Sequence, residues 1–151
     1  MKRLAILPCG AAKIWDKYPN LGPQQAKDVY SSSFHQTTRA YAEQFIGEWV
    51  ILSAKHGFLF PDDTISENYN VSFSMSKANI ISDEQLQRQI SEKGLAQYDQ
   101  LVVLGGKKYH RVVERNFSNI DFCYPLKGCK GIGYMLQRMK NAMKNHSEIQ
   151  C

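Results

Sequence analysis

The stretch "EWVILSAKHG", residues 48–57, joins a short apolar run to a polar loop, and it decides the fold expected for this chain. Apolar runs of this length suit strands that are buried on both faces of a parallel sheet. Ser53, Lys55 and His56 follow at once, and polar groups are costly at the end of a buried strand unless they find partners or serve a function. The stretch therefore predicts a core strand that ends at a ligand-binding edge.

Three further stretches repeat this pattern: "KRLAILP" at 2–8, "QLVVLGG" at 100–106 and "IDFCYP" at 120–125. Helical signals, either apolar residues at helical spacing or capping residues, occur in the segments 31–47, 82–97, 108–117 and 131–144. Strands that alternate with helices predict one α/β domain over residues 1–151, in three layers: a mainly parallel four-stranded sheet with helices on both faces. We expect the rest of the central region, 58–81, to be irregular and the tail, 146–151, to be loose.

The positive charge is concentrated in the last third of the chain. Residues 101–151 hold nine Lys and Arg against three Asp and Glu, whereas residues 1–100 hold ten against eleven. A one-sided surplus favours a polyanionic partner, and nucleic acid or nucleotide phosphate is the commonest one. The alternative is that the last helix merely presents a solvated basic face.

Other features of the sequence indicate the cellular compartment. Cys9, Cys123, Cys129 and Cys151 lack metal-binding spacing, and we interpret them as free thiols in a reducing compartment. Because Lys2 and Arg3 run into an apolar stretch of only strand length, we expect no signal peptide, and no apolar run in the sequence is long enough to span a membrane. We therefore expect a cytoplasmic protein without a membrane partner, metal or cofactor; the oligomeric state stays open.

All four predicted strands run into loops that carry glycine, lysine or both. Parallel strands end at one edge, so these loops are expected to form a single anion-binding crevice. Taken singly, each glycine is more simply a turn residue and each lysine a surface residue. The predicted ligand- or phosphate-binding residues are Gly10, Lys13, Lys55, Gly57, Gly105, Gly106, Lys107, Lys127, Gly128 and Lys130.

Residues 53–69 resemble the central motif of the peroxide-stress YaaA proteins. The opening is similar through Pro8 and Lys13, and "KGCKGIGYMLQRM" at 127–139 looks like the segment that leads into the last YaaA helix. The chain is much shorter than YaaA, lacks its helical insert and carries Glu67 where proline is usual. The matching motif positions are Ser53, Gly57, Leu59, Pro61, Asp63, Ile65 and Tyr69.

In size the chain is more similar to a family of small, uncharacterised bacterial and archaeal domains related to YaaA. The order of its elements is also distantly similar to that of uracil-DNA glycosylases, although neither of their signature loops is present. These resemblances imply a Rossmann-like α/β fold and a part in a stress response or in DNA maintenance.

Candidate catalytic residues cluster around the second strand. Asp63 is the first choice for a general base that activates water, with Asp62 and Glu67 as alternatives. Ser53 would orient Asp63 or a ligand, and His56 would act as an acid, a base or a phosphate ligand. The alternative for the two aspartates is a turn after Pro61, and for His56 a local hydrogen bond.

Two function classes stay open from the sequence. Tyr69 and Trp15 are expected to stack on a base, and Cys9 is either a nucleophile or a buried thiol. One class is a nucleic-acid or nucleotide-binding protein that cleaves or exchanges an N-glycosidic bond. The other is a binding module for DNA, RNA or a nucleotide without chemistry. The cations expected to line the bound backbone are Arg111, Arg115, Arg138, Lys140 and Lys144.

Overall fold

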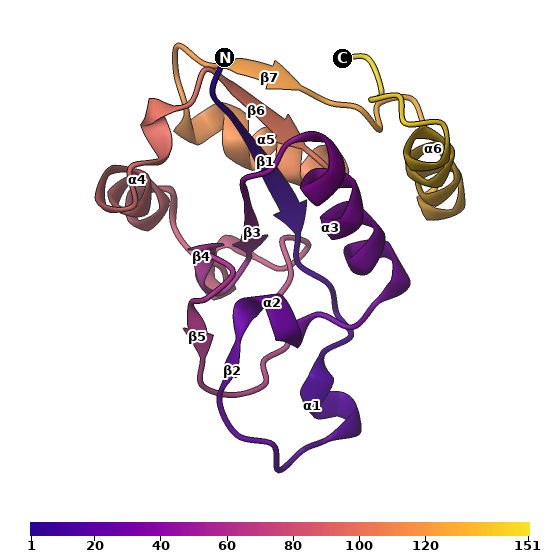
Figure 1. The fold of residues 1–151 in the computed structure, drawn as a ribbon. Coiled ribbons are helices and arrows are strands. Elements are labelled where there is room, and N and C mark those ends of the chain that lie inside the picture. Colours follow the sequence, from indigo (N-terminus) through magenta and orange to yellow (C-terminus); the bar gives the residue numbers. More distant parts are fainter.

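A central five-stranded sheet organises the computed structural model, which describes all residues 1–151 (Figure 1). The strand order is β4-β3-β1-β6-β7, and β1, β3, β6 and β7 are mutually parallel. Only β4 is antiparallel, paired with β3. The strands of this sheet are β1 (Arg3–Pro8), β3 (Trp49–Ser53), β4 (Gly57–Leu59), β6 (Gln100–Val103) and β7 (Asp121–Cys123).

Helices cover both faces of the sheet, as the sequence predicts (Figure 1). The main helices are α3 (Ser33–Phe45), α4 (Asp83–Glu92), α5 (Lys107–Asn116) and α6 (Ile132–Lys144). Short elements lie beyond the carboxyl ends of the strands or connect the larger ones: α1 (Ile14–Lys17), α2 (Ala26–Val29), β2 (Gln24–Gln25), β5 (Thr64–Ile65) and the 3₁₀ turns η1 (Lys77–Asn79) and η2 (Leu95–Gln97).

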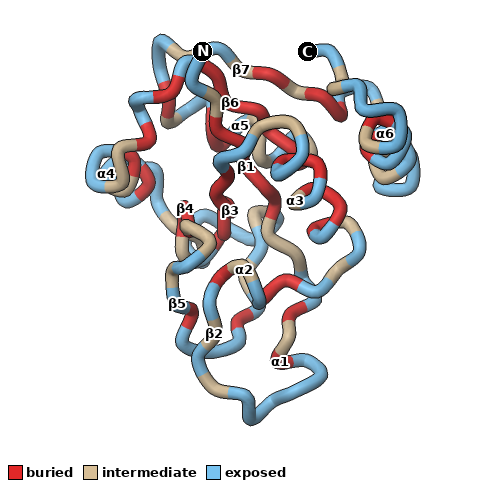
Figure 2. The backbone as a smooth tube through the Cα atoms, viewed as in Figure 1, coloured by how far each residue is buried: buried red, intermediate tan, exposed pale blue.

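Alternation along the strands divides the core into two halves. On β1, Ala5 and Leu7 pack on the face with α3 and α6, whereas Leu4 and Ile6 pack on the face with α4 and α5. The inner strands are buried along nearly their whole length (Figure 2), which is why they read as continuous apolar runs. None of the helices combines the length and apolarity needed to cross a membrane.

The central region corrects the expected number of strands. Residues 57–59 form β4, an edge strand that follows a tight turn after β3, and residues 64–65 pair as β5 with β2. The sequence prediction of an irregular segment at 58–81 and of four strands is wrong here. A three-residue strand has too few side chains to show an alternating pattern.

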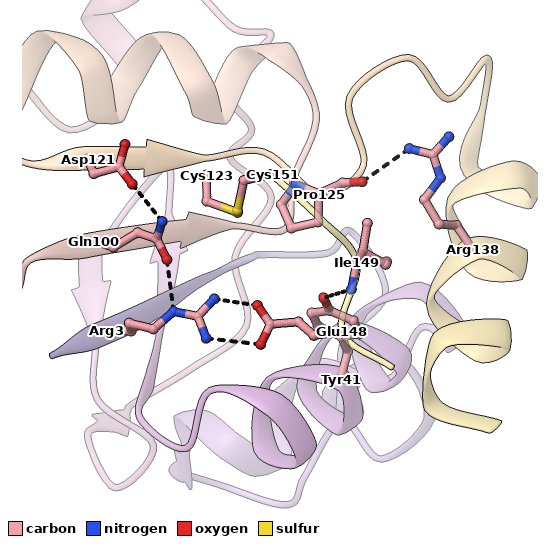
Figure 3. The surroundings of a disulfide bond; sticks show 10 residues. All are labelled: Arg3, Tyr41, Gln100, Asp121, Cys123, Pro125, Arg138, Glu148, Ile149 and Cys151. Carbon is pink, nitrogen blue, oxygen red and sulfur yellow. Dashed lines mark hydrogen bonds and ion pairs between the residues drawn. A yellow bond between two sulfur atoms is a disulfide. The ribbon is translucent and has the colours of Figure 1, made fainter. Parts of the chain in front are cut away.

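The cysteine prediction is wrong for one pair. Cys123 at the end of β7 and Cys151 at the C-terminus form a disulfide (Figure 3), while Cys9 and Cys129 are free. The two bonded residues are 28 positions apart in the chain, with the whole of α6 between them. Sequence spacing does not reveal the pair because the return of the tail to β7 brings it together.

The tail is anchored rather than loose. Arg3 on β1 forms an ion pair with Glu148 through both guanidinium η nitrogens, and the Ile149 N–H donates to Tyr41 Oη over 3.1 Å (Figure 3). Glu148 is thereby held at the amino end of β1, and the disulfide fixes Cys151 at the end of β7.

Candidate functional site

The largest hollow in the protein lies where β1, β6 and β7 end. It has a volume of about 800 Å³ and is framed by the first turns of α3, α5 and α6. Parallel strands bring these loops to one edge, which is the position where open α/β sheets hold ligands. The lining residues that matter here are Cys9, Gly10, Ser32, Phe34, Gly106, Lys107, Lys108, Tyr109, Cys129, Lys130, Ile132 and Met135.

The cavity is electrostatically suited to an anion. Lys107, Lys108 and Lys130 line it, and no Asp or Glu does. Gly106 and Gly131 precede α5 and α6, and no side chain caps either helix, so first-turn backbone N–H groups remain available. Helix N-termini and lysines both stabilise negative charge, and here they act on the same space.

A smaller hollow of about 290 Å³ adjoins the main cavity. The two share Gly106, Lys107, Cys129 and Met135, and the residues that the smaller one adds include Gly105, Lys127, Gly128 and a carboxylate, Glu114. Three of the four predicted glycine-and-lysine loops therefore meet at one place, as the sequence predicts. The exception is the loop after β3, which contributes no residue to either hollow.

A chain of hydroxyl groups lies at the carboxyl end of β3. Ser53 Oγ accepts the Lys55 and His56 N–H groups over 3.2 and 3.1 Å, so its own hydrogen is directed at Tyr69 Oη, 3.0 Å away. Tyr69 continues the chain to the hydroxyl of Tyr30. Burial raises the pKa of Tyr69 to about 12 and that of Tyr30 still further, so both phenols stay protonated at neutral pH. Ser53 thus orients Tyr69, not Asp63.

Two lysine ammonium groups flank the Tyr69 ring. Lys13 Nζ lies 4.3 Å and Lys55 Nζ 5.6 Å from the ring centroid, within the range of cation–π attraction. Lys13 is only 3% exposed, its ammonium donates to the Ala11 carbonyl oxygen over 3.1 Å, and neither lysine belongs to an ion pair. Burial lowers the pKa of Lys13. An anion would therefore be stabilised beside this cluster.

Two histidines, the buried His35 and the half-buried His56, have an unused nitrogen. His35 Nδ1 donates to the Pro8 carbonyl oxygen over 2.8 Å. The ring of His56 packs edge-on against the ring of Tyr69, with 4.9 Å between the ring centroids. Nε2 of each has no hydrogen-bond partner. Burial lowers the pKa of both rings, and the charge of Lys55 adds to the effect at His56, so both are neutral at pH 7.

Cys9 and Tyr109 form a contact on the cavity wall. It lines the cavity, and its Sγ lies 3.4 Å from Tyr109 Oη, which also donates to the Cys9 carbonyl oxygen over 3.1 Å. The sequence leaves open whether Cys9 is exposed to a ligand, and the structure places it half-buried on the wall. No group of three His, Cys, Asp or Glu side chains is arranged to hold a metal ion.

The predicted carboxylate base does not lie in the cavity. Asp63 Oδ2 accepts the Phe60 N–H over 2.7 Å and pairs with Lys93 Nζ at 2.8 Å, which closes a turn. Asp62 is exposed and forms a 3.3 Å ion pair with Lys27, and Glu67 is exposed without an ion pair. The turn interpretation of Asp62 and Asp63 describes their contacts better than the catalytic one.

Three other residues that the sequence predicts to contact a ligand are instead packed inside the structure. A Cβ atom at Gly57, where φ is +75°, would lie 2.1 Å from Gln89 Oε1, so this glycine allows close packing against α4. Trp15 is 4% exposed and donates to the Gly22 carbonyl oxygen over 2.7 Å. Tyr69 is 8% exposed. Neither aromatic ring presents a free face for a base.

Sequence reasoning did not identify Lys108, Ser32 and Tyr109 as part of the cavity wall. Lys108 follows Lys107 directly. A helix that begins directly after the "GG" pair places both lysines in its first turn, and this signal could have identified Lys108. Ser32 and Tyr109 carry no sequence signal of their own, because only the packing of α3 and α5 turns them towards the cavity.

The chain is similar to proteins whose functions are not known. It is 49% identical over 150 residues to "Uncharacterized protein YfjM" of Bacillus subtilis (strain 168), covering 99% of this chain and 100% of that protein. A crystal structure of AF0587, a protein of unknown function, matches with a TM-score of 0.48 and 17% identity over 95% of this chain, which spans 44% of that longer one. The model of one family matches residues 5–141. Because this match spans most of the chain, the chain belongs to DUF6884, a family of unknown function.

Proposed function

We propose that this protein binds nucleic acid or a nucleotide, with a phosphate group at the first turns of α5 and α6. One observation carries the proposal: a cavity of about 800 Å³ combines two uncapped helix N-termini with three lysines and no carboxylate. Backbone N–H groups would bind the phosphate oxygens, while Lys107 and Lys130 would supply charge.

The size and the apolar part of the wall favour a nucleotide over a simple anion. A volume of this order is typical of pockets for organic ligands, which lie roughly between 300 and 1,000 Å³. Phe34, Ile132 and Met135 supply apolar surface for a base or sugar. The basic surplus in residues 101–151 agrees with a polyanionic partner.

Binding of fluorescently labelled oligonucleotides and of nucleoside phosphates tests the proposal. We expect the double variant Lys107→Ala/Lys130→Ala to bind at least about tenfold more weakly, and the salt slope for a single strand to fall by about 0.7 for each phosphate that is no longer neutralised. Lys2→Ala/Arg88→Ala is the matched control, because it also removes two positive charges, from exposed residues that line neither hollow. Equal affinities of both variants would contradict the proposal.

A base-directed reaction is the second candidate function. It is favoured by Cys9 and Tyr109, whose thiol and hydroxyl groups are placed together on the cavity wall. In N-glycosidic cleavage, water would add its hydroxyl to the sugar carbon and the departing base would gain a proton. The test is chromatographic detection of free base after incubation with nucleosides and oligonucleotides. Release that persists in Cys9→Ser and Tyr109→Phe would exclude this wall as the site.

A relation to the YaaA proteins stays a proposal, supported by the order of residues between Ser53 and Tyr69. The contacts of the shared positions explain why such a motif would recur without catalysis. Ser53 and Tyr69 hold the exit of β3, and Asp63 closes the next turn.

A further inference from the structure

A third hollow, of about 550 Å³, runs along the outer face of α6. Cys129 and Lys130 line both this hollow and the main cavity, so the two adjoin each other. A ligand with a phosphate in the main cavity could extend past Lys130 onto the helix. The remaining lining residues are Gly128, Tyr134, Gln137, Arg138 and Asn141.

The side chains along this hollow occupy one face of the helix. Tyr134, Gln137, Arg138 and Asn141 follow the i, i+3, i+4, i+7 spacing, and Tyr134 is the most exposed of the large hydrophobic side chains on the helix. The opposite face of α6 packs into the core through Met139 and neighbouring apolar residues. Tyr134, Gln137 and Asn141 therefore take no part in the core packing of α6.

The composition of this face matches the chemistry of a polynucleotide. Tyr134 is 62% exposed, a large aromatic ring with a face open to a base. Gln137 and Asn141 line the hollow and offer side-chain donors and acceptors to base edges. The helix contains Arg138, Lys140 and Lys144 but no Asp or Glu.

Arg138 positions the wall of the hollow. Its Nη1 donates to the carbonyl oxygens of Pro125 and Lys127, over 3.1 and 2.9 Å. These bonds hold the loop that carries Lys130 against α6. Arg138 is therefore a positioning residue, and Tyr134 is the residue to test for contact.

We propose that the ligand is a single-stranded polynucleotide that leaves the main cavity past Lys130 and stacks a base on Tyr134. The proposal rests on the proposed function, because it extends the same site. An unpaired strand fits better than a duplex, since a base must be unstacked from its neighbours to lie on an exposed aromatic ring. Lys130 and Arg138 line the hollow and no Asp or Glu does, so its charge is complementary to a polyanion.

Affinity as a function of ligand length tests this inference. The probes are a mononucleotide, a single strand of about 4 nucleotides and one of about 12, with the longer duplex for comparison. We expect Tyr134→Ala to weaken binding of the longest strand roughly 5- to 100-fold and to leave mononucleotide binding unchanged. Tyr134→Phe keeps the ring and should restore the affinity. Tyr18→Ala, which removes another exposed tyrosine, is the matched control.

The outcomes separate the two proposals. If Lys107→Ala/Lys130→Ala weakens binding of every ligand but Tyr134→Ala binds the long strand like the parent, the strand path is overturned and the cavity proposal stands. If the long strand depends on Tyr134 but not on these lysines, the phosphate site in the cavity is overturned, and so is a path that starts there; only the stacking on Tyr134 stands. A duplex that binds as tightly as the single strand, without dependence on Tyr134, also overturns the path along α6.

Discussion

Lys13 and Tyr69 meet at the carboxyl end of the sheet, with the lysine Nζ 4.3 Å from the centroid of the tyrosine ring. Lys13 follows β1, and Tyr69 belongs to the segment after β5. The pair brings a buried positive charge, without an ion-pair partner, next to the hydroxyl chain of Ser53 and Tyr30. Burying an ammonium group without an ion-pair partner lowers the free energy of unfolding unless a bound ligand compensates for it.

Replacement of Lys13 by methionine should therefore stabilise the protein, by on the order of 1 kcal/mol in the free energy of unfolding near neutral pH. The apolar side chain fills similar space without the cost of burying a charge. Urea denaturation of parent and variant measures the difference. A large drop in stability would show that the ammonium group is needed to hold the strand exits together.

The parent protein and the Lys13→Met variant should also differ in how their free energy of unfolding depends on pH. Burial holds the pKa of Lys13 below its ordinary value of 10.5, so the unfolded chain binds this proton where the folded state has released it. Stability rises with pH in that interval, because the unfolded state binds more protons there. The advantage of Lys13→Met should therefore shrink as the pH rises towards 10.5, the ordinary pKa at which the unfolded chain also loses this proton.

Asp63→Ala should destabilise the protein by about 1–3 kcal/mol, because the variant leaves the Phe60 N–H and Lys93 without their shared acceptor. Asp62→Ala is the matched control: its carboxylate is exposed and its pair with Lys27 should contribute less than about 1 kcal/mol. Chemical denaturation curves with equal midpoints for the two variants would show that the turn does not depend on Asp63.

Gly57→Ala should cost about 2–4 kcal/mol, since it combines a positive φ with a contact of 2.1 Å between the new Cβ and Gln89 Oε1. Gly106→Ala is the control, because no atom lies within 4 Å of its Cβ position and its φ is −80°. We expect Gly106→Ala to keep the thermal midpoint within a few degrees. The assignment of Gly57 to packing fails if both variants melt alike.

Cys151→Ser should lower the free energy of unfolding by about 3–4 kcal/mol, because the Cys123–Cys151 bond closes a segment of 28 residues in the unfolded chain. Cys129→Ser removes a free thiol instead and should change stability by less than about 1 kcal/mol. Mass spectrometry after alkylation of the unfolded, unreduced protein should find two modified cysteines. Four modified cysteines would mean that the bond does not form.

The sequence predicts the architecture because its signals are local. Runs such as residues 2–8 and 48–53 are largely apolar, since both faces of each strand are buried, and four of them alternate with helical patterns. The same rule places the strand exits at one edge, so Gly10, Gly106 and Lys107 could be assigned to a common crevice before any coordinates.

Only the tertiary structure distinguishes ligand groups from structural ones. Lys13 and Lys107 both follow strand ends, yet one is buried against Tyr69 and the other lines the open cavity. Asp63 is part of a motif-like stretch, but its hydrogen bonds lie in a turn. Hydrogen bonding, burial and the disulfide depend on contacts between distant segments, which no local pattern encodes. The sequence alone therefore determined the parallel sheet and the edge at which its strands end in glycine- and lysine-bearing loops. The tertiary packing decided which side chains at that edge remain free to contact a ligand.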